Sequence, residues 1–147
     1  MPVVTFTGTR ELPHEWEPRI HDLVGALPIG AVAVVGVCLG FDALVARLAH
    51  QRGVWVHAVV PADRSRVDPD WRRYAATWEE MAPGRTYRQR DERMVALAAN
   101  YQGRVVAVPR WPEESERSRR SGTWMTVRIA RLRCLPIHLE RLWLPPP

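Results

Sequence analysis

The chain has 147 residues, of which 46% are hydrophobic and 25% are charged, and its formal net charge is +5. This length suits one domain with a single core, and no apolar run approaches the roughly 20 residues of a membrane-spanning helix. All 21 basic residues are arginine, which excludes the Schiff-base, pyridoxal-phosphate and P-loop chemistries that depend on a lysine.

The first half of the chain alternates between strand and helix patterns. Val3 to Phe6 is a short apolar strand, and the apolar runs Ala31 to Val35 and Val54 to Val60 are typical of strands buried on both faces. Between them, apolar residues recur at helical spacing from Trp16 to Leu27 and from Phe41 to Ala49. The pattern predicts two β-α units followed by a third strand.

The alternation continues in the second half. Asp68-Pro69-Asp70 is typical of a helix N-cap with a first-turn proline. It predicts a helix with apolar residues from Trp71 to Trp78 that ends near Pro83. A further helix is predicted from Met94 to Tyr101, followed by a strand from Val105 to Val108.

The last part of the chain begins with a polar segment, Arg110 to Arg120, whose lack of apolar periodicity predicts a mobile loop. Met125, Ile129 and Leu132 predict a final helix, and Pro136 to Leu139 predicts a last short strand.

Together these patterns predict an α/β fold, a Rossmann-like, doubly wound and mostly parallel sheet with helices on both faces. We expect a single domain over residues 1–143 and a proline-rich tail over residues 144–147. The N-terminus lacks a basic lead and an apolar signal segment, so we expect a cytoplasmic protein with no membrane partner.

Three turns rich in small residues each follow a predicted strand. They are Thr7 to Arg10, Gly36 to Gly40, and the stretch Arg119 to Thr126. In a parallel sheet such turns meet at the edge formed by the carboxyl ends of the strands. A helix that starts there has unpaired N–H groups and a positive dipole end, so it accepts a phosphate once glycine removes the Cβ obstruction. The turns therefore predict one anion pocket, and nucleotide binding is the first hypothesis.

The first two turns also have ordinary structural interpretations. Thr7-Gly8-Thr9-Arg10 suits a phosphate or a ribose, and equally a tight β-α bend with a threonine cap. The second turn is not a dinucleotide fingerprint, because Gly36 and Gly40 are four residues apart. Asp42 is either an acidic group favoured by the helix dipole or an acceptor for a ligand hydroxyl.

Cations cluster where the helix that contains Met94 is predicted to start. Arg88 and Arg90, next to Asp91, are unfavourable there against the helix dipole. A bound anion would explain them, and a surface salt bridge from Arg90 to Glu92 or Asp91 is the alternative. Trp124 follows the third turn and is the best candidate to stack on a base, although tryptophans at helical spacing more often belong to a core.

Metal sites and hydrolytic triads have no support. Cys38 and Cys134 lack metal-ligand spacing and are expected to be buried free thiols. The histidines form no local metal pair, and no serine lies in a nucleophile elbow. The arginines are dispersed along the chain, which favours a solvated basic surface over nucleic-acid contact.

The order of these motifs resembles the SLOG superfamily, a Rossmann-like group that includes DNA-processing protein A, the Lonely Guy phosphoribohydrolases and the small YspA/YpsA-like proteins. Thr7-Gly8-Thr9-Arg10 looks like the family's opening Gly-Ser/Thr-Arg turn, and Gly36 to Asp42 looks like its Gly-x-Ala/Cys-x-Gly-x-Asp segment. Arg90-Asp91-x-x-Met94 is similar to its Arg-Asn-x-x-Met helix start. Ser121-Gly122-Thr123-Trp124-x-Thr126 is similar to its phosphate loop. The resemblance covers most of the chain.

The sequence departs from the Lonely Guy pattern where those enzymes do chemistry. Thr126 stands in the position of their catalytic glutamate, Arg119-Arg120 replaces a Gly-Gly pair, and Asp91 replaces an asparagine. The resemblance is therefore closest to the YspA/YpsA-like branch, whose members are expected to sense or bind nucleotide-derived ligands. It also implies a homodimer, because related proteins usually self-associate.

We therefore expect a sensor or binding protein for a nucleotide or a nucleotide-derived molecule, with no other cofactor. The phosphate would lie at Gly122 and Thr123, helped by Arg10 and Arg90. The expected ligand-binding residues are Gly8, Thr9, Arg10, Gly36, Gly40, Asp42, Arg88, Arg90, Ser121, Gly122, Thr123 and Thr126.

Two alternatives remain open. One is a nucleotide hydrolase, cleaving an N-glycosidic or a phosphate bond, in which Asp42 or Asp91 replaces the missing glutamate as acid or base. The other is a module that binds single-stranded DNA through arginines and exposed tryptophans.

Overall fold

The computed structural model describes residues 2–142, so the predicted proline-rich tail over residues 144–147 lies outside the described residues. Six strands form one sheet. Their bounds are β1 (Val3–Gly8), β2 (Val32–Val35), β3 (Trp55–Val60), β4 (Thr77–Glu80), β5 (Arg104–Val108) and β6 (Ile137–Leu139). The strand order is β4-β3-β2-β1-β5-β6, and every neighbouring pair is parallel.

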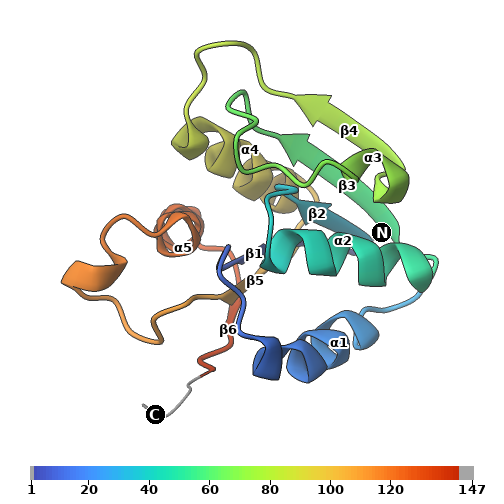
Figure 1. The fold of residues 1–147 in the computed structure, drawn as a ribbon, viewed down its shortest axis with the longest axis horizontal. Helices are drawn as coiled ribbons and strands as arrows, with labels where there is room; N and C mark the ends of the chain where they lie inside the picture. The colour runs from blue at the N-terminus through green and yellow to red at the C-terminus, as the bar shows by residue number, and fades with distance from the viewer. Residues whose placement is uncertain (1, 143–147) are drawn as a thin grey trace.

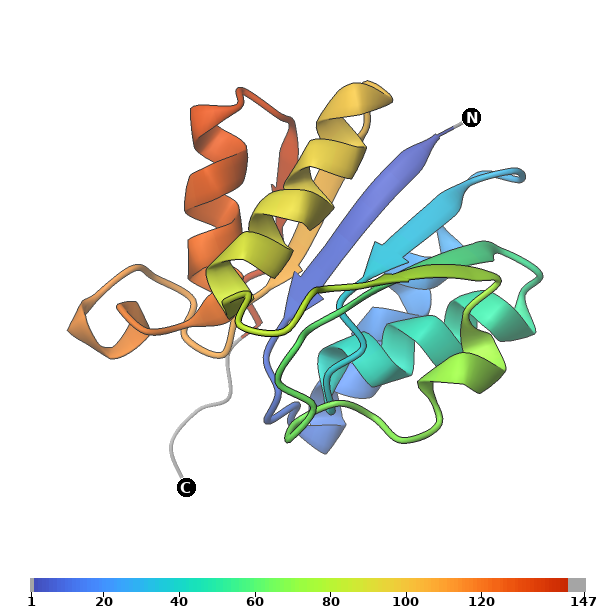
Figure 2. The ribbon, with the colours of Figure 1, turned by 90° about the horizontal axis from the view of Figure 1, so that it is seen from above.

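Helices cover both faces of this sheet (Figures 1 and 2). Their bounds are α1 (Glu17–Gly25), α2 (Phe41–Gln51), α3 (Trp71–Tyr74), α4 (Tyr87–Asn100) and α5 (Gly122–Leu132), with short 3₁₀ helices η1 (His14–Trp16) and η2 (Glu116–Ser118). Helices α1 and α2 lie on one face, and α4 and α5 lie side by side on the other (Figure 2). No helix within residues 2–142 is long and apolar enough to cross a membrane. The predicted α/β, doubly wound fold is confirmed.

The sheet is apolar on both sides because both sides are covered. All four residues of β2 are buried, and so are four of the five residues of β5. One core, which contains Phe6 and Phe41, lies under α1 and α2. Smaller clusters lie under α4 and α5. The buried hydroxyl of Thr5 donates to the Met94 carbonyl at 2.8 Å, which ties β1 to α4.

The order of the strands creates one special edge. The chain moves outward from β1 through β2 and β3 to β4, and then returns to the other side of β1 to form β5 and β6. The turns that follow β1 and β5 therefore leave the sheet toward opposite faces. In doubly wound sheets a crevice opens at such a reversal, outside the carboxyl ends of the strands.

The predicted helix from Trp71 to Trp78 is wrong in its second half. Helix α3 has only four residues, and Thr77–Glu80 forms β4, which pairs with β3. Trp78 still contacts Trp71, with ring centroids 5.5 Å apart, but it does so from a strand. The two tryptophans therefore pack together, as their spacing suggested, but they do not share a helix, because the backbone becomes extended at Ala75.

The final helix also differs in the face that it buries. Leu132, predicted for that face, is 81% exposed, whereas Trp124 is 1% exposed and packs against Ala107 and Val127. The indole of Trp124 donates to the Trp111 carbonyl at 3.0 Å. The interpretation of Trp124 as a base-stacking residue is therefore wrong, because its ring belongs to the core.

The cysteines are both free, but only one is buried. Cys38 is 2% exposed, whereas Cys134 is exposed in the turn after α5. The expectation of two buried thiols is thus wrong for Cys134, which lies past the end of the apolar helix face.

Candidate ligand-binding site

A cavity of about 650 Å³ opens at the carboxyl edge of the sheet. Its walls come from the turns after β1, β2, β3 and β5 and from the N-terminal ends of α4 and α5. This volume lies in the range of roughly 300–1,000 Å³ that is typical of small-molecule sites. Because its walls include the turns after β1 and β5, the cavity lies where the strand order reverses.

The topology brings most of the predicted binding residues to this cavity. Those that line it are Gly8, Thr9, Arg10, Asp42, Arg90, Ser121, Gly122 and Thr123. Asp91, the second candidate catalytic carboxylate, lines it as well. Those that do not line it are Gly36, Gly40, Arg88 and Thr126.

Gly36 and Gly40 allow the cavity wall to pack closely. A Cβ on Gly36 would lie 2.0 Å from Nη1 of Arg90. Gly40 has a φ of 87°, and its Cβ would lie 2.2 Å from the carbonyl oxygen of Arg10. Both positions therefore require glycine for reasons of packing rather than for ligand contact.

The second turn also offers few free donors. The amide of Cys38 donates to Oδ2 of Asp42 at 3.4 Å, and the amide of Phe41, at the start of α2, donates to the Thr9 carbonyl at 3.0 Å. These bonds use amides that an anion would need. The amides of Gly40 and Asp42 have no acceptor in the described chain, as is usual at the start of a helix.

The N-terminus of α5 contributes two available amides to the wall of the cavity. Ser121 is the N-cap residue, and its hydroxyl accepts the amide of Trp124 at 3.3 Å. The amides of Gly122 and Thr123 have no hydrogen-bond acceptor in the part of the chain that the structure describes. The Thr126 hydroxyl donates to the Gly122 carbonyl at 3.0 Å, so Thr126 stabilises this first turn without lining the cavity.

Arg90 and Asp91 form a buried ion pair in the wall that α4 contributes. Nε of Arg90 donates to Oδ1 of Asp91 at 2.9 Å, and its Nη1 donates to the Gly36 carbonyl at 2.9 Å. The two residues are 6% and 2% exposed. Oδ2 of Asp91 is buried without a hydrogen-bond partner among residues 2–142. Arg90 therefore spends most of its donors within the protein and positions the wall of the cavity.

Two buried carboxyl groups in this wall are shifted toward the neutral form. Burial raises the pKa of Asp42 to about 6, against the opposing effects of Arg90 and of the Cys38 amide. Burial also raises the pKa of Asp91, and the ion pair with Arg90 opposes that change. At least Asp42 can therefore exchange a proton near neutral pH.

Arg88 does not belong to the site. It lies on the exposed side of α4, where its Nε pairs with Glu92 at 3.1 Å. The helix start is instead stabilised by a capping box of Thr86 and Gln89, which the sequence reading missed. The salt-bridge alternative was made for Arg90, which does pair with Asp91, although this pair is buried and does not lie on the surface.

Several lining residues were missed from the sequence. They are Glu11, Asp63, Ser65, Arg66, Tyr87, Arg110 and Trp111. Four more, Thr7, Cys38, Arg120 and Met125, lie within the three predicted turns but were not among the expected binding residues. A signal existed for Asp63 to Arg66, because that segment follows the predicted third strand and must reach the same edge of the sheet. Tyr87 is held by its neighbours: Arg10 lies over its ring at 4.9 Å from the centroid, and its hydroxyl donates to the Asp63 carbonyl.

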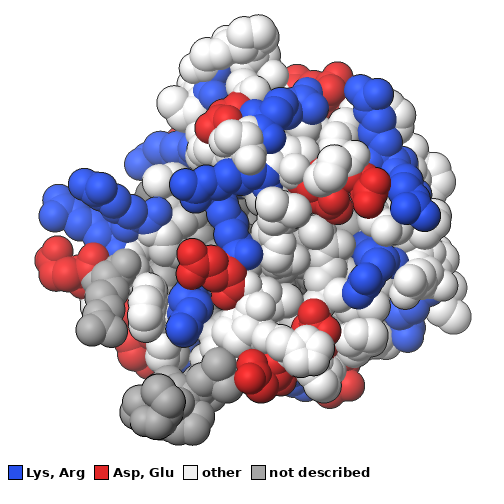
Figure 3. All heavy atoms as spheres, viewed as in Figure 1, with Lys and Arg blue, Asp and Glu red and all other residues white. Residues whose placement is uncertain are grey.

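Charges of both signs are interspersed on the face of the molecule shown in Figure 3, and they form no continuous basic stripe. Residues 2–142 contain no cluster of three or more histidine, cysteine or acidic side chains that could hold a metal ion. The described site is therefore a mixed polar cavity with a helix N-terminus in its wall.

Comparison with known proteins shows a shared fold. The sequence matches no family model, and no curated protein matches it significantly. The solved structure of TM1055, a structural-genomics target, superposes with a TM-score of 0.70 at 18% identity, over 93% of this chain and 72% of its own. DNA processing protein A from Streptococcus pneumoniae superposes with a TM-score of 0.72 at 18% identity, over 95% of this chain. The Helicobacter pylori homologue, whose structure concerns its binding of single-stranded DNA, gives 0.65 at 18% identity, over 94%.

This chain spans 50% and 64% of the lengths of those two DNA processing proteins. The Rossmann-like fold expected from the sequence is shared by these neighbours. At this level of identity the likeness concerns the fold alone.

Proposed function

We propose that the protein binds a nucleotide or a nucleotide-derived molecule in this cavity, as a sensor or binding protein. The observation that carries the proposal is the pair of unpaired amides, on Gly122 and Thr123, at a helix N-terminus that opens into a cavity of about 650 Å³. Such a terminus accepts a phosphate, and the cavity has room for the rest of a nucleotide.

Hydroxyl groups around the phosphate position support this proposal. Thr7 and Thr123 line the cavity, and their hydroxyls make no hydrogen bond within the described chain. The Thr9 hydroxyl accepts the Glu11 amide at 3.2 Å and retains its own proton as a donor. The carboxylates of Asp42 and Asp91 offer acceptors for sugar hydroxyls.

The substitution Gly122→Asp tests the phosphate position. A Cβ at Gly122 meets no atom within 4 Å, and an acidic residue in the first helical turn favours the helix. The variant is therefore expected to fold as well as the parent protein and to repel a phosphate. Gly122→Asn has nearly the same shape without the charge and is the matched control.

The experiment is a thermal-shift screen against nucleotides, followed by calorimetric titration of any ligand found. We expect stabilisation by a nucleotide that is lost in Gly122→Asp, is largely retained in Gly122→Asn, and leaves the nucleotide chemically intact. Binding that survives in Gly122→Asp would contradict the assigned phosphate position. The absence of any nucleotide binding would contradict the function and make single-stranded DNA, with a steep salt dependence, the next ligand to test.

A nucleotide hydrolase is the second candidate, and the raised pKa of Asp42 favours it. A carboxyl group with a pKa of about 6 is poised to donate a proton to a leaving group. Release of base or phosphate during the titration, abolished by Asp42→Asn, would establish this activity.

The homodimer and the assignment to the YspA/YpsA-like branch stay predictions. Exposed apolar side chains at the far ends of the paired helices α4 and α5, Tyr101 and Leu132, support self-association. Sedimentation velocity of the parent protein and of Leu132→Arg would test the dimer.

A further inference from the structure

A second group of reactive side chains lies outside the cavity, where β3 and β4 pair at the edge of the sheet (Figure 1). His57 of β3 lies opposite Thr77 of β4, and Glu79 follows two residues later on the same strand. Because side chains alternate between the two faces of a strand, all three project from one face. This group could not be foreseen from the sequence, because the pattern there predicted a helix instead of β4.

The three side chains are joined by hydrogen bonds. Nδ1 of His57 lies 2.8 Å from the Thr77 hydroxyl, and its Nε2 lies 3.0 Å from Oε2 of Glu79. Arg93, on α4, donates to both oxygens of Glu79, through Nε and, at 3.2 Å, through Nη2. Burial alone would raise the pKa of Glu79, but the bonds from Arg93 and His57 outweigh it and hold this pKa below its usual value. Glu79 is therefore ionised at neutral pH.

The ionised carboxylate sets the direction of the other bonds. It only accepts, so Nε2 of neutral His57 carries the proton and Nδ1 has a lone pair. The Thr77 hydroxyl therefore donates to Nδ1, and it accepts the indole N–H of Trp55 at 3.1 Å. A carboxylate that holds an imidazole in this tautomer, with a hydroxyl on the other ring nitrogen, is the arrangement in which histidine acts as a base toward a nucleophile.

The hydroxyl group of this relay is open to solvent, whereas the base is partly covered. Thr77 is exposed, and the neighbouring Trp55 is 52% exposed. The side chains of His57 and Glu79 are only 19% and 31% exposed. A substrate can therefore reach the oxygen of Thr77 while the protein holds the imidazole in place.

A backbone donor lies next to the hydroxyl. β4 is the last strand on its side of the sheet, and the Met81 amide donates to the Val60 carbonyl of β3 at 2.9 Å. Alternate residues of a parallel strand bond to the same neighbour, so the amide of Trp78 faces the open edge. Such an amide, one residue after Thr77, is a donor for the negative oxygen that forms when a hydroxyl attacks a carbonyl group.

The surroundings of Thr77 favour an uncharged electrophile. Arg93 is engaged by Glu79, and the negative charge of Glu79 repels a phosphate. The half-exposed ring of Trp55 instead offers an apolar surface to an acyl or aryl group. A neutral, activated acyl ester or thioester fits this position.

We propose that Thr77 is a nucleophile for activated acyl donors, with His57 as its general base and Glu79 as the residue that positions His57. Nδ1 of His57 takes the hydroxyl proton while Oγ1 of Thr77 bonds to the carbonyl carbon. The bond from that carbon to the leaving group then breaks, and the leaving group departs with the proton from Nδ1. The products are an ester of Thr77 and a free alcohol, phenol or thiol. This activity is separate from the proposed nucleotide binding and does not depend on it.

Reaction with p-nitrophenyl acetate tests the proposal, because the released p-nitrophenol and the acetyl group on the protein can both be measured. The chain contains no lysine, the side chain that most often takes up acetyl groups. The exposed thiol of Cys134 is removed by Cys134→Ser in every protein compared. Peptide mass spectrometry should place an acetyl group on Thr77. Thr86, an exposed hydroxyl that bonds to Gln89 rather than to a histidine, is the internal control and should stay unmodified.

Two substitutions separate the relay from simple exposure. Thr77→Val keeps a β-branched side chain on the strand and should abolish the rapid release of p-nitrophenol. His57→Gln should slow the acetylation of Thr77 about 100-fold, which is the contribution expected of a general base. His50→Gln, on α2, removes an imidazole elsewhere and should leave the rate unchanged. Thr77 that reacts no faster than Thr86, or as fast in His57→Gln as in the parent, would overturn the proposal.

The positioning role of Glu79 has a spectroscopic readout of its own. In Glu79→Gln an amide N–H can face Nε2, so the ring can carry its proton on Nδ1 and lose the lone pair directed at Thr77. We expect acetylation to slow about tenfold, and the nitrogen resonances of His57 to change from the Nε2–H tautomer to a mixture. Glu80→Gln is the matched control, because Glu80 is the next residue of β4 and pairs with Arg64 instead. An unchanged rate in Glu79→Gln would overturn the role assigned to Glu79.

Discussion

Two walls of the same cavity use arginine in opposite ways. In the wall formed by Gly36, Asp42, Arg90 and Asp91, which we call the interlocked wall, Arg90 is 6% exposed and its Nε and Nη1 donate to protein acceptors. Arg110 and Arg120, which also line the cavity and which we call the arginine rim, lack a carboxylate partner among the described residues. Burial therefore decides whether a charge serves the fold or is available to a ligand.

The difference between the two walls predicts different effects of substitutions on stability and on binding. Removing one partner of a buried ion pair costs several kcal/mol, because the other charge is left in a medium of low dielectric. Removing an exposed charge costs about 1 kcal/mol or less. Substitutions in the interlocked wall should thus change stability, and those at the arginine rim should change binding.

The largest loss of stability is expected from Gly40→Ala. The new Cβ would lie 2.2 Å from the Arg10 carbonyl oxygen, in a backbone conformation with a φ of 87°. Steric overlap and strain together predict a loss of about 4 kcal/mol in the free energy of unfolding, measured by urea denaturation. Gly30→Ala is the control, since Gly30 also has a positive φ, of 83°, but open space around it. It should cost only about 1–2 kcal/mol, and equal losses would contradict the close packing of the wall.

The next largest loss of stability is expected from substitution of Arg90, and Arg88 on the same helix provides the control. Arg90→Gln leaves Asp91 buried without its cation and should cost about 3 kcal/mol. Arg88→Gln removes only an exposed pair with Glu92 and should cost less than about 0.5 kcal/mol. Urea denaturation of both variants measures the contrast. If Arg90→Gln lowered the free energy of unfolding as little as Arg88→Gln does, the buried ion pair of the interlocked wall would contribute no more to stability than a surface pair.

Arg88 and Arg90 also show how much the sequence reveals about the burial of a side chain. Arg90 shares a helical face with Met94 and Ala98, at a spacing of four residues, and both of those are buried. That spacing marks Arg90 as buried, whereas Arg88 lies on another face. Because both residues are arginines near the start of the same helix, residue type and position in the helix do not distinguish the buried one from the exposed one.

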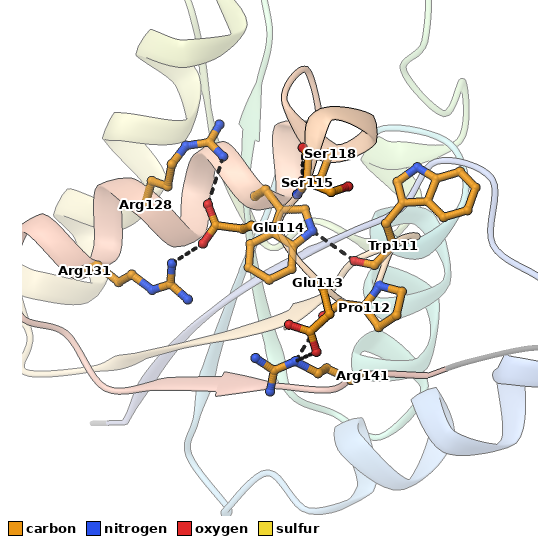
Figure 4. Close-up of polar contacts among 10 residues, drawn as sticks. Trp111, Pro112, Glu113, Glu114, Ser115, Ser118, Arg128, Arg131 and Arg141 are labelled. Carbon is orange, nitrogen blue, oxygen red and sulfur yellow. Dashed lines mark hydrogen bonds and ion pairs between the residues drawn. The ribbon is translucent and has the colours of Figure 1, made fainter.

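The fold was more predictable than the site. Four of the five predicted strands, β1, β2, β3 and β5, are largely buried apolar runs. Because the carboxyl ends of parallel strands meet at one edge of the sheet, the turns after these strands could be expected to lie together. β4 was missed because it is an exposed edge strand whose Trp78 keeps a helical spacing to Trp71. The ion pairs that hold the acidic residues of the 110–120 loop were also hidden, because they join residues more than ten positions apart, such as Glu114 and Arg128 (Figure 4).

A third prediction concerns Asp42 and the pH dependence of stability. Its pKa in the folded protein is about 6, above the value of about 3.9 expected in the unfolded chain. Folding therefore favours the protonated form: the stabilisation is complete below pH ~4 and is lost as the pH rises through about 6. Asp42→Asn keeps the acceptor for the Cys38 amide without the charge.

Relative to the parent protein, Asp42→Asn should gain roughly 2–3 kcal/mol between pH 4 and pH 8. Urea denaturation across this range measures the gain. Asp63→Asn is the control of opposite sign, because the pKa of Asp63 is lowered and its charge favours the folded state. A pH-independent effect of Asp42→Asn would mean that Asp42 is not buried in the interlocked wall as the structure describes it.

The smallest effect on stability is expected from the loop that carries the arginine rim. Glu114→Gln removes the ion pairs with Arg128 and Arg131, but the Glu114 side chain is 38% exposed, so the free energy of unfolding should fall by less than about 1 kcal/mol. The bond from Trp124 to the Trp111 carbonyl remains and keeps one end of the loop attached.

Local opening of the loop should nevertheless become more frequent, because few buried contacts hold it. Trypsin should therefore cleave within residues 110–120 faster in Glu114→Gln than in Glu92→Gln, which loses a single surface pair on α4. If Glu114→Gln instead destabilised the whole protein as much as Arg90→Gln, the loop would be part of the interlocked wall, and the contrast between the two walls would disappear.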